Sequence, residues 1–358
     1  YELKPENACI LEMFSTLFIK CFQTNSSCPS SCRCNPQGAA MCTGSTITDI
    51  PLDSDLFEGL TNLTFLNLGR NFIKKLPPTI FHSLTKLQQL ILYYNELEFL
   101  EAGIFDKLIN LVELKLHQNQ IASLPPKVFW PLGNLKNLTL SSNQLQAIPE
   151  KSFYHMPKLV KLTIYKNPLL SLPDELMGHM DLPPDVFCCL PNLQKLSLKS
   201  NNLHYLHPQL FSKLTTLKKL HLNDNDLPGD IFVSLPALMN LTLSGNPWDC
   251  NCAIRGIARW MRHNEHVLWD RDDVMCHTPV YQLLRTVGSL HDEEFSFCSA
   301  TTSLVTLPVT SSTHIPVTSV GAVLFWKSNF PEEPTRGINK VLSYLILYIF
   351  PCPLNKEA

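Results

Sequence analysis

The chain of 358 residues is 45% hydrophobic and carries a formal net charge of −2 at pH 7. This nearly neutral balance gives no electrostatic reason to expect binding to nucleic acid, whose phosphates attract strongly basic proteins. The sequence also contains no glycine-rich phosphate-binding motif, so we expect neither a nucleotide site nor any other cofactor.

Two segments precede the main body of the chain. Residues 1–27 include an apolar run that Glu12 interrupts, and we interpret them as a partial signal or leader segment. Residues 28–50 follow as a short cysteine-rich segment. Its four closely spaced cysteines are Cys28, Cys32, Cys34 and Cys42.

Residues 51–247 repeat the pattern L-x-x-L-x-L-x-x-N, and the first five closing asparagines are 24 residues apart. A period of this length with this pattern is the signature of leucine-rich repeats, in which each repeat adds one short strand to a solenoid. We therefore predict an α/β solenoid with one extended core. The closing asparagines are Asn71, Asn95, Asn119, Asn143, Asn167, Asn201, Asn225 and Asn246.

The repeated residues have clear structural roles. The leucines cannot be buried within one repeat, so we expect them to pack between neighbouring repeats. Each closing asparagine is expected to bond backbone groups of its own bend and of the neighbouring repeat, because buried amides must be paired. Leu-Pro pairs favour loops and short turns on the convex side. Phenylalanines at one register should fill that side: Phe81, Phe105, Phe129, Phe153, Phe187, Phe211 and Phe232.

The spacing breaks between Asn167 and Asn201, which are 34 residues apart. We expect irregular stacking around 177–186, which would be the weak point of the solenoid. One explanation is the loss of a strand between Met180 and Asp181. The alternative is an insertion of 10 residues in a loop, which solenoids tolerate.

Residues 248–298 hold a second cysteine group. A solenoid has an open apolar surface at each end and needs caps, and disulfides are the usual staples of caps in secreted chains. We predict two disulfide-stapled caps, with zinc sites as the less favoured alternative. Four cysteines allow three pairings, which spacing alone does not decide. The second group is Cys250, Cys252, Cys276 and Cys298.

The end of the chain has a different composition. Residues 299–320 are rich in Ser, Thr and Pro, which is typical of an O-glycosylated stalk. Residues 321–358 match neither repeat, cap nor stalk, so we leave them unassigned and expect disorder. Their apolar run at 341–350 is too short for a membrane-spanning helix, which needs about 20 residues.

Two further features bear on processing. Two adjacent cysteines, Cys188 and Cys189, fall where other repeats carry exposed residues. We expect surface thiols there, with a disulfide-linked partner as the alternative. Four glycosylation sequons agree with a secretory route, which the cysteine-rich caps also favour. They begin at Asn25, Asn62, Asn137 and Asn240.

Both caps carry a recognisable pattern. The segment CPSSCRC with Cys42, and the segment NPWDCNC with Trp260, Cys276 and Cys298, resemble the caps of extracellular vertebrate leucine-rich repeat proteins. The chain looks most similar to the group of leucine-rich alpha-2-glycoprotein and the carboxypeptidase N regulatory subunit. The ectodomains of platelet glycoproteins Ib and V and the lamprey variable lymphocyte receptors are near alternatives. The resemblance implies a horseshoe with a parallel sheet on its concave side. It also implies the pairs Cys28–Cys34, Cys32–Cys42, Cys250–Cys276 and Cys252–Cys298.

The strand motif predicts which side chains face the concave surface. Its third, fifth, seventh and eighth positions should point outward, because side chains alternate along a strand. Seven basic and two acidic residues occupy these positions, so we predict a basic face that binds an acidic protein ligand. The alternative is a solvated lysine surface without a partner. The candidate ligand-binding residues are Phe65, Arg70, Tyr93, Tyr94, Lys115, His117, Lys161, Tyr165, Lys166, Lys195, Lys199 and Lys219.

These features predict a secreted, extracellular glycoprotein that binds protein ligands and performs no catalysis. The alternative is a cell-surface adhesion or immune receptor whose ectodomain stands on the 299–320 stalk. We expect no enzyme, because the sequence contains neither H-E-x-x-H nor G-x-S-x-G. No catalytic residue and no metal ligand is therefore assigned.

Overall fold

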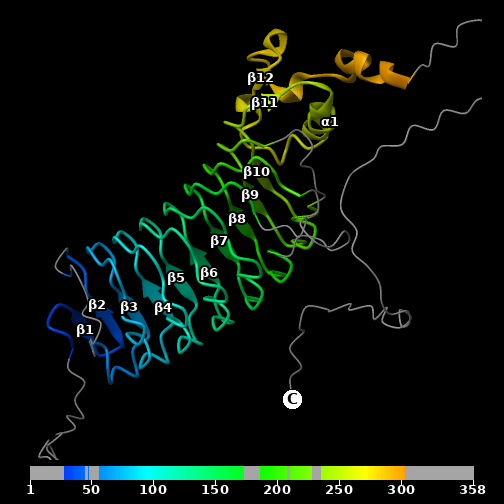
Figure 1. Ribbon diagram of the computed structural model, residues 1–358. Coiled ribbons are helices and arrows are strands. Elements are labelled where there is room, and N and C mark those ends of the chain that lie inside the picture. The colour runs from blue at the N-terminus through cyan, green and yellow to red at the C-terminus, as the bar shows by residue number, and fades with distance from the viewer. Residues whose placement is uncertain are drawn as a thin grey trace, which may run out of the picture. The chain divides into compact units, whose positions relative to one another are not determined.

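The chain divides into two units, Tyr1–Cys298 and Ser299–Ala358. In the first unit, ten short strands form one sheet in chain order (Figure 1). In the second unit only residues 299–302 are described, so the leader, most of the stalk and the tail lie outside the described residues. The computed structural model describes residues 28–44, 47, 56–172, 186–207, 210–227 and 235–302.

The sheet begins in the N-terminal cap and continues with one strand from each repeat. The cap contributes an antiparallel hairpin of β1 (Arg33–Asn35) and β2 (Ala39–Met41), and β2 pairs in parallel with the first repeat strand. All later neighbours are parallel, as predicted for a solenoid. The repeat strands are β3 (Phe65–Asn67), β4 (Gln89–Ile91), β5 (Glu113–Lys115), β6 (Asn137–Thr139), β7 (Lys161–Thr163), β8 (Lys195–Ser197), β9 (Lys219–His221) and β10 (Asn240–Thr242).

The C-terminal cap contains most of the helical structure. Its helix α1 (Arg255–His263) buries Ile257, Ala258 and Met261, so an amphipathic helix covers the apolar end of the column. The small sheet of β11 (Trp248–Asp249) and β12 (Cys276–Thr278) lies in the same cap. Short 3-10 helices complete it: η1 (Cys252–Ile254), η2 (Arg271–Asp273), η3 (Val280–Gln282), η4 (Val287–Ser289) and η5 (Asp292–Thr302).

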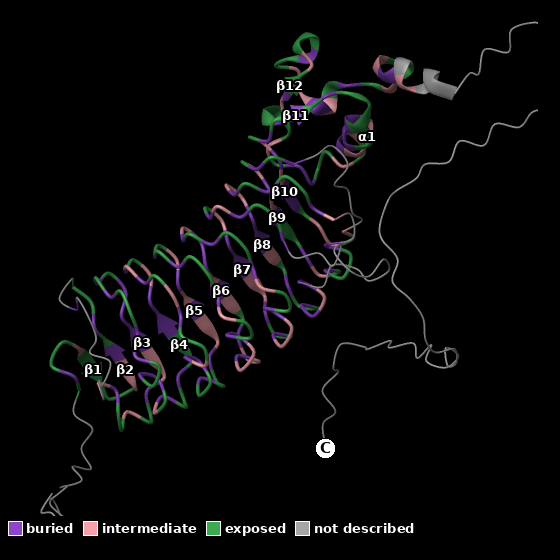
Figure 2. Ribbon diagram, in the orientation of Figure 1, coloured by how far each residue is buried: buried purple, intermediate pink, exposed green. Residues whose placement is uncertain are grey.

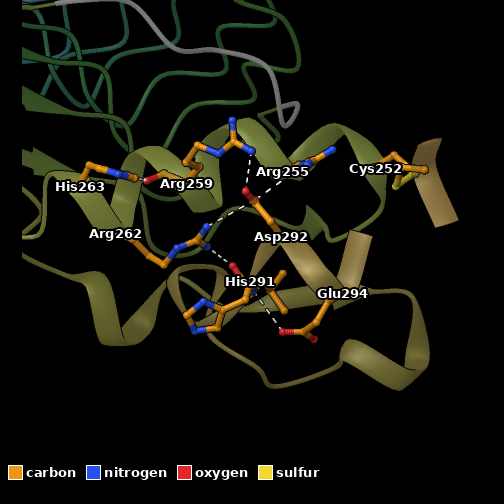
Figure 3. A network of polar contacts seen from close by, with 10 residues as sticks. Cys252, Arg255, Arg259, Arg262, His263, His291, Asp292 and Glu294 are labelled. Carbon is orange, nitrogen blue, oxygen red and sulfur yellow. Dashed lines mark hydrogen bonds and ion pairs between the residues drawn. A yellow bond between two sulfur atoms is a disulfide. The ribbon is translucent and has the colours of Figure 1, made fainter. Parts of the chain in front are cut away.

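A polar network fastens α1 to the end of this cap (Figure 3). Arg255, Arg259 and Arg262 lie on one helix face, because residues three and four apart are neighbours on a helix. Arg259 donates to Asp292 Oδ2 at 2.6 Å, and the other two guanidinium groups lie 3.6 Å from Oδ1. The hydrogen bond from Arg259 is the main cause that holds the pKa of Asp292 below its ordinary value. This face of α1 is therefore structural.

The core is a continuous column beneath the sheet (Figure 2). The central leucines of adjacent strands, such as Leu114, Leu138 and Leu162, are fully buried and in register. The predicted phenylalanines form a second column, with ring centroids 6.2–6.4 Å apart from Phe81 to Phe211. The remaining member, Phe232, lies outside the described residues.

The asparagine ladder is present at all eight closing positions, whose side chains are buried. Asn143 is representative of its bonding. Its Nδ2 donates to the carbonyls of Leu140 in its own repeat and Leu116 in the preceding repeat, each at 3.0 Å. Its Oδ1 accepts from the Ile121 N–H at 3.1 Å. Each asparagine thereby satisfies buried backbone groups of two repeats, as the sequence predicts.

The sheet stays regular across the 34-residue repeat. Strands β7 and β8 pair directly and in register. Phe153 and Phe187 stack at 6.2 Å, as closely as any other pair in the column.

The asparagine ladder does change at this repeat, because Asn201 Oδ1 accepts from the N–H of Asn167 itself at 3.2 Å, whereas Asn167 and Asn225 accept from the residue two positions after the preceding ladder asparagine. The predicted irregularity at 177–186 stays a prediction. Most of the 177–186 segment lies outside the described residues, which resume at Val186.

The structure contains the four cap disulfides that the family resemblance implies: Cys28–Cys34, Cys32–Cys42, Cys250–Cys276 and Cys252–Cys298. The expectation of exposed thiols is wrong for Cys189, which is 7% exposed and disulfide-bonded. The short cysteine side chain can be enclosed at a turn position where longer polar side chains of other repeats reach solvent. Cys188 is half-buried. No helix among the described residues is long and apolar enough to cross a membrane.

Candidate functional site

The outer face of the sheet is hollowed into a groove of about 870 Å³ that extends from β5 to β10. Alternate residues of each short strand form its floor, while the intervening leucines point into the core. Seven of the twelve candidate binding residues line this groove. They are Lys115, His117, Lys161, Tyr165, Lys166, Lys195 and Lys199.

Three lysines lie side by side in this region. Lys195 is directly opposite Lys161 on one neighbouring strand and Lys219 on the other. Adjacent strands are about 4.8 Å apart, so the three side chains share one face at close spacing. Within the described ranges none of the three forms an ion pair. Burial, and after it the charges of neighbouring lysines, lower the pKa of Lys195. We call these three residues the lysine stack.

Two histidines line the groove, His117 after β5 at one end and His221 on β9. Burial lowers the pKa of both His117 and His221, nearby lysines lower it further, and Asp270 partly opposes this for His221. His221 Nδ1 is 3.1 Å from Thr242 Oγ1, which donates to Asn223 Oδ1 at 2.9 Å. Because the Thr242 hydroxyl donates its proton to Asn223, its oxygen accepts a hydrogen bond from Nδ1 of His221. In the neutral ring the proton is therefore on Nδ1, and Nε2 carries none.

An aromatic ledge of Arg70, Tyr93, Tyr94 and His117 adjoins the groove. Tyr93 stacks on His117 at 5.0 Å and meets Tyr94 edge-on at 5.7 Å. The Arg70 guanidinium lies 4.9 Å from the Tyr94 ring centre. A Cβ on Gly69 would lie only 3.3 Å from the Tyr93 ring, so the missing side chain leaves room for that ring.

The other candidate residues are placed less centrally. Lys219 is exposed beside the groove, and Phe65 is half-buried on β3, away from the groove lining.

The lysines that line the groove differ in how far their charge is paired. Lys115 forms an ion pair with Glu113 at 3.3 Å, so the basic charge is partly neutralised on β5. Lys199 lies over the Tyr165 ring at 5.4 Å. The unpaired charge is therefore concentrated on β7 to β9.

Several residues that line the groove were not predicted from the sequence. Thr139, Thr163 and Thr242 occupy the fifth motif position, which the strand rule does identify, but their neutral side chains gave no signal. Asp270 comes from the C-terminal cap and reaches the end of the groove. Its carboxylate accepts from the Leu243 N–H at 2.9 Å, a bond that in other repeats goes to a carbonyl of the next repeat, and also from the Ser244 N–H at 2.8 Å.

The sequons differ in accessibility. Asn62 is exposed, and its Oδ1 accepts from Lys86 Nζ at 2.7 Å. Asn137 is half-buried on β6. Asn240 is 4% exposed, so a glycan there would require its side chain to leave a buried position. Asn25 lies outside the described residues.

No group of His, Cys, Asp or Glu side chains in the described part of the chain is arranged to hold a metal ion. The groove instead offers ammonium groups, hydroxyls and imidazoles on one open surface. Such a surface can form salt bridges and hydrogen bonds with a bound chain.

The parallel sheet, asparagine ladder and paired caps define a leucine-rich repeat solenoid. A family profile described as "Leucine rich repeat" matches more than half of the sequence, and the chain therefore belongs to this family. The matches cover residues 47–97, 87–145, 133–182, 179–227 and 191–247.

Individual relatives match shorter stretches. Chondroadherin of Mus musculus is 33% identical over 88 residues, which is 24% of either protein. Trophoblast glycoprotein of Mus musculus is 31% identical over 103 residues, 27% of this chain and 24% of the relative. A phospholipase A2 inhibitor of Gloydius brevicaudus siniticus is 33% identical over 111 residues, 30% of this chain and 33% of the relative. The chain thus matches only a quarter to a third of these proteins.

The fold also agrees with a solved structure. The crystal structure of human 5T4, or trophoblast glycoprotein, superposes with a TM-score of 0.57 and 26% sequence identity. The superposition covers 76% of this chain and 99% of that chain. The predicted solenoid is confirmed, while the finer likeness to plasma and platelet glycoproteins stays a prediction.

Proposed function

We propose that the protein is an extracellular binding protein whose groove holds an acidic segment of another protein. The lysine stack supports this most directly. Like charges directly opposite on neighbouring strands destabilise a sheet, and no carboxylate of the described residues is paired with them. A ligand that supplies carboxylates would remove this repulsion and favour the charged form of Lys195.

The rest of the groove suits a polypeptide ligand. Hydroxyl, amide and imidazole groups such as those of Thr242, Asn223 and His221 can bond the backbone of a bound chain. The aromatic ledge would add apolar contact at the β4–β5 end, because aromatic and arginine side chains are enriched in binding hot spots. Acidic side chains would then bind over β7 to β9, and apolar ones on the ledge.

Two observations support an extracellular location. Four disulfides staple the two caps, and such bonds persist in oxidising compartments. Exposed Asn62 is available for glycosylation. A secreted protein without catalysis is the favoured form, and a cell-surface receptor on the 299–320 stalk is the alternative. Detection of the native protein in culture medium or on the cell surface would distinguish them.

A charge-reversal experiment tests the groove. The double variant Lys161→Glu, Lys195→Glu changes the lysine stack, and Lys136→Glu, Lys218→Glu makes the same net charge change at exposed positions off the groove. A polyglutamate peptide serves as the probe. The first variant should weaken binding by at least about tenfold, or 1.4 kcal/mol, and reduce its salt dependence. The control should change it little, and equal weakening by both variants contradicts the proposal.

A further inference from the structure

The concave sheet continues beyond the last repeat into the C-terminal cap. The Leu241 N–H donates to the Val267 carbonyl at 2.9 Å, and the Trp269 N–H donates to the Leu241 carbonyl at 3.1 Å. Leu241 and Leu268 form a parallel bridge. Residues 267–269 therefore pair with β10 as the strand of a further repeat would, although they belong to no repeat.

This pairing places Trp269 on the groove side of the sheet. Leu241 and Leu268 are both buried, so their side chains point into the core. Successive side chains on a strand point to opposite faces, which directs Trp269 outward alongside Thr242. The next residue, Asp270, lines the groove. Trp269 thus lies beside the C-terminal end of the groove, next to the lining residue Asp270.

Trp269 is exposed and firmly positioned. Its side chain is 71% exposed, while Trp248 is fully buried and Trp130 and Trp260 are half-buried. The backbone N–H of Trp269 donates to the Leu241 carbonyl of β10. The carboxylate of the next residue, Asp270, accepts from the backbone N–H groups of Leu243 and Ser244, which follow β10. A large aromatic ring held in place loses little conformational freedom when a ligand packs on it, which favours binding.

We infer that Trp269 is a binding residue of the groove and packs against a large apolar side chain of the same partner. This inference rests on the proposed function, because the lysine stack holds the acidic part of that partner. Three strand spacings and an offset of two residues along the strand separate Lys195 from Trp269, or about 16 Å. An extended chain covers this distance in about four to five residues. The favoured partner segment therefore has an apolar side chain about four or five positions from its acidic residues.

Matched peptides and variants test this inference. One peptide carries two central glutamates with a leucine four residues to either side, and its counterpart carries alanine at both outer positions. The wild-type protein should bind the leucine peptide about tenfold more tightly, the effect expected of one hot-spot contact. Trp269→Ala should remove this preference, and Trp269→Phe should retain part of it. Tyr281→Ala is the control, because Tyr281 is 70% exposed in the same cap but lies in η3 and not in the segment that pairs with β10.

Fluorescence quenching and peptide affinity together distinguish failure of the Trp269 inference from failure of the basic-groove proposal. Bound leucine peptide should protect the protein from acrylamide quenching of tryptophan fluorescence, and this protection should disappear in Trp269→Ala. If Trp269→Ala keeps the leucine preference while Lys161→Glu, Lys195→Glu weakens both peptides, the inference about Trp269 is wrong and the basic groove stands. If neither variant alters binding, both proposals fail.

Discussion

Lys195 on β8 lies directly opposite Lys161 on β7, with both side chains on the same face of the sheet. Opposed like charges at this spacing are destabilising, by analogy with other cross-strand pairs, by roughly 0.2–1 kcal/mol. A neutral residue at either position would suit the fold better. The pair therefore does not serve stability, which supports the proposed binding of an acidic ligand.

Replacing Lys195 by glutamine should stabilise the free protein by about 0.5 kcal/mol at low salt, because the repulsion is removed. Denaturant midpoints at low salt and at about 1 M salt measure the effect, which should shrink as the Debye length falls to about 3 Å. The matched change Lys218→Gln, at an exposed position off the groove, should give no such gain. A gain that is independent of salt would contradict the electrostatic explanation.

Stability should fall as the pH drops below about 6.5, the ordinary pKa of histidine in an unfolded chain. The folded-state pKa values of His117 and His221 lie below this value. Between the folded and unfolded pKa values the unfolded chain binds more protons, so stability rises with pH and is lost on acidification. Thermal unfolding at pH 7 and pH 5 should show a smaller loss for His221→Asn. The exposed control His277→Asn should behave as the wild type does.

Binding of an acidic peptide should have the opposite pH dependence. Carboxylates near His117 and His221 favour the imidazolium form, so a bound peptide raises both pKa values. Affinity should therefore increase from about pH 7.5 to pH 5.5, with proton uptake on binding. Calorimetry in buffers of different ionisation enthalpy measures this uptake. His221→Asn should reduce it, and an unchanged proton count would show that His221 does not face the ligand.

Removal of one buried ladder side chain should be far more costly than removal of an exposed one. Asn143→Ala leaves the groups on Leu116, Leu140 and Ile121 without their partner and should cost about 3 kcal/mol. Asn134→Ala also removes two bonds between repeats, one from Nδ2 to a carbonyl at 2.9 Å and one from a lysine Nζ to Oδ1 at 2.7 Å, but that side chain is more accessible. Its cost should stay near 1 kcal/mol or below. Similar denaturant midpoints for both variants would refute the proposed role of burial.

Local repetition made much of this fold predictable. The strand motif defines which residues point inward, so the leucine column, the asparagine ladder and most of the phenylalanine column follow from spacing. The same alternation identified the three residues of the lysine stack. The regular pairing across the 34-residue repeat did not follow from spacing, because strand register is determined by pairing and burial rather than by loop length.

Contacts between distant segments could not be predicted from repetition. Asp270 reaches the groove, and Trp269 lies beside it, only because cap residues pair with Leu241 on β10. The cap disulfides likewise followed from family resemblance and not from cysteine spacing.

Gln118 provides a test of backbone strain in the repeat turn. It precedes a ladder asparagine, is exposed, and has a φ of 58°, a left-handed conformation that costs a residue with a Cβ roughly 1–2 kcal/mol. Gln118→Gly should therefore stabilise the protein, by up to about 1 kcal/mol after the greater flexibility of glycine in the unfolded chain is counted. Lys136→Gly, at an exposed position without positive φ, should destabilise it by about 0.5–1 kcal/mol. Denaturant midpoints that fall equally for both variants would show that the turn stores no strain.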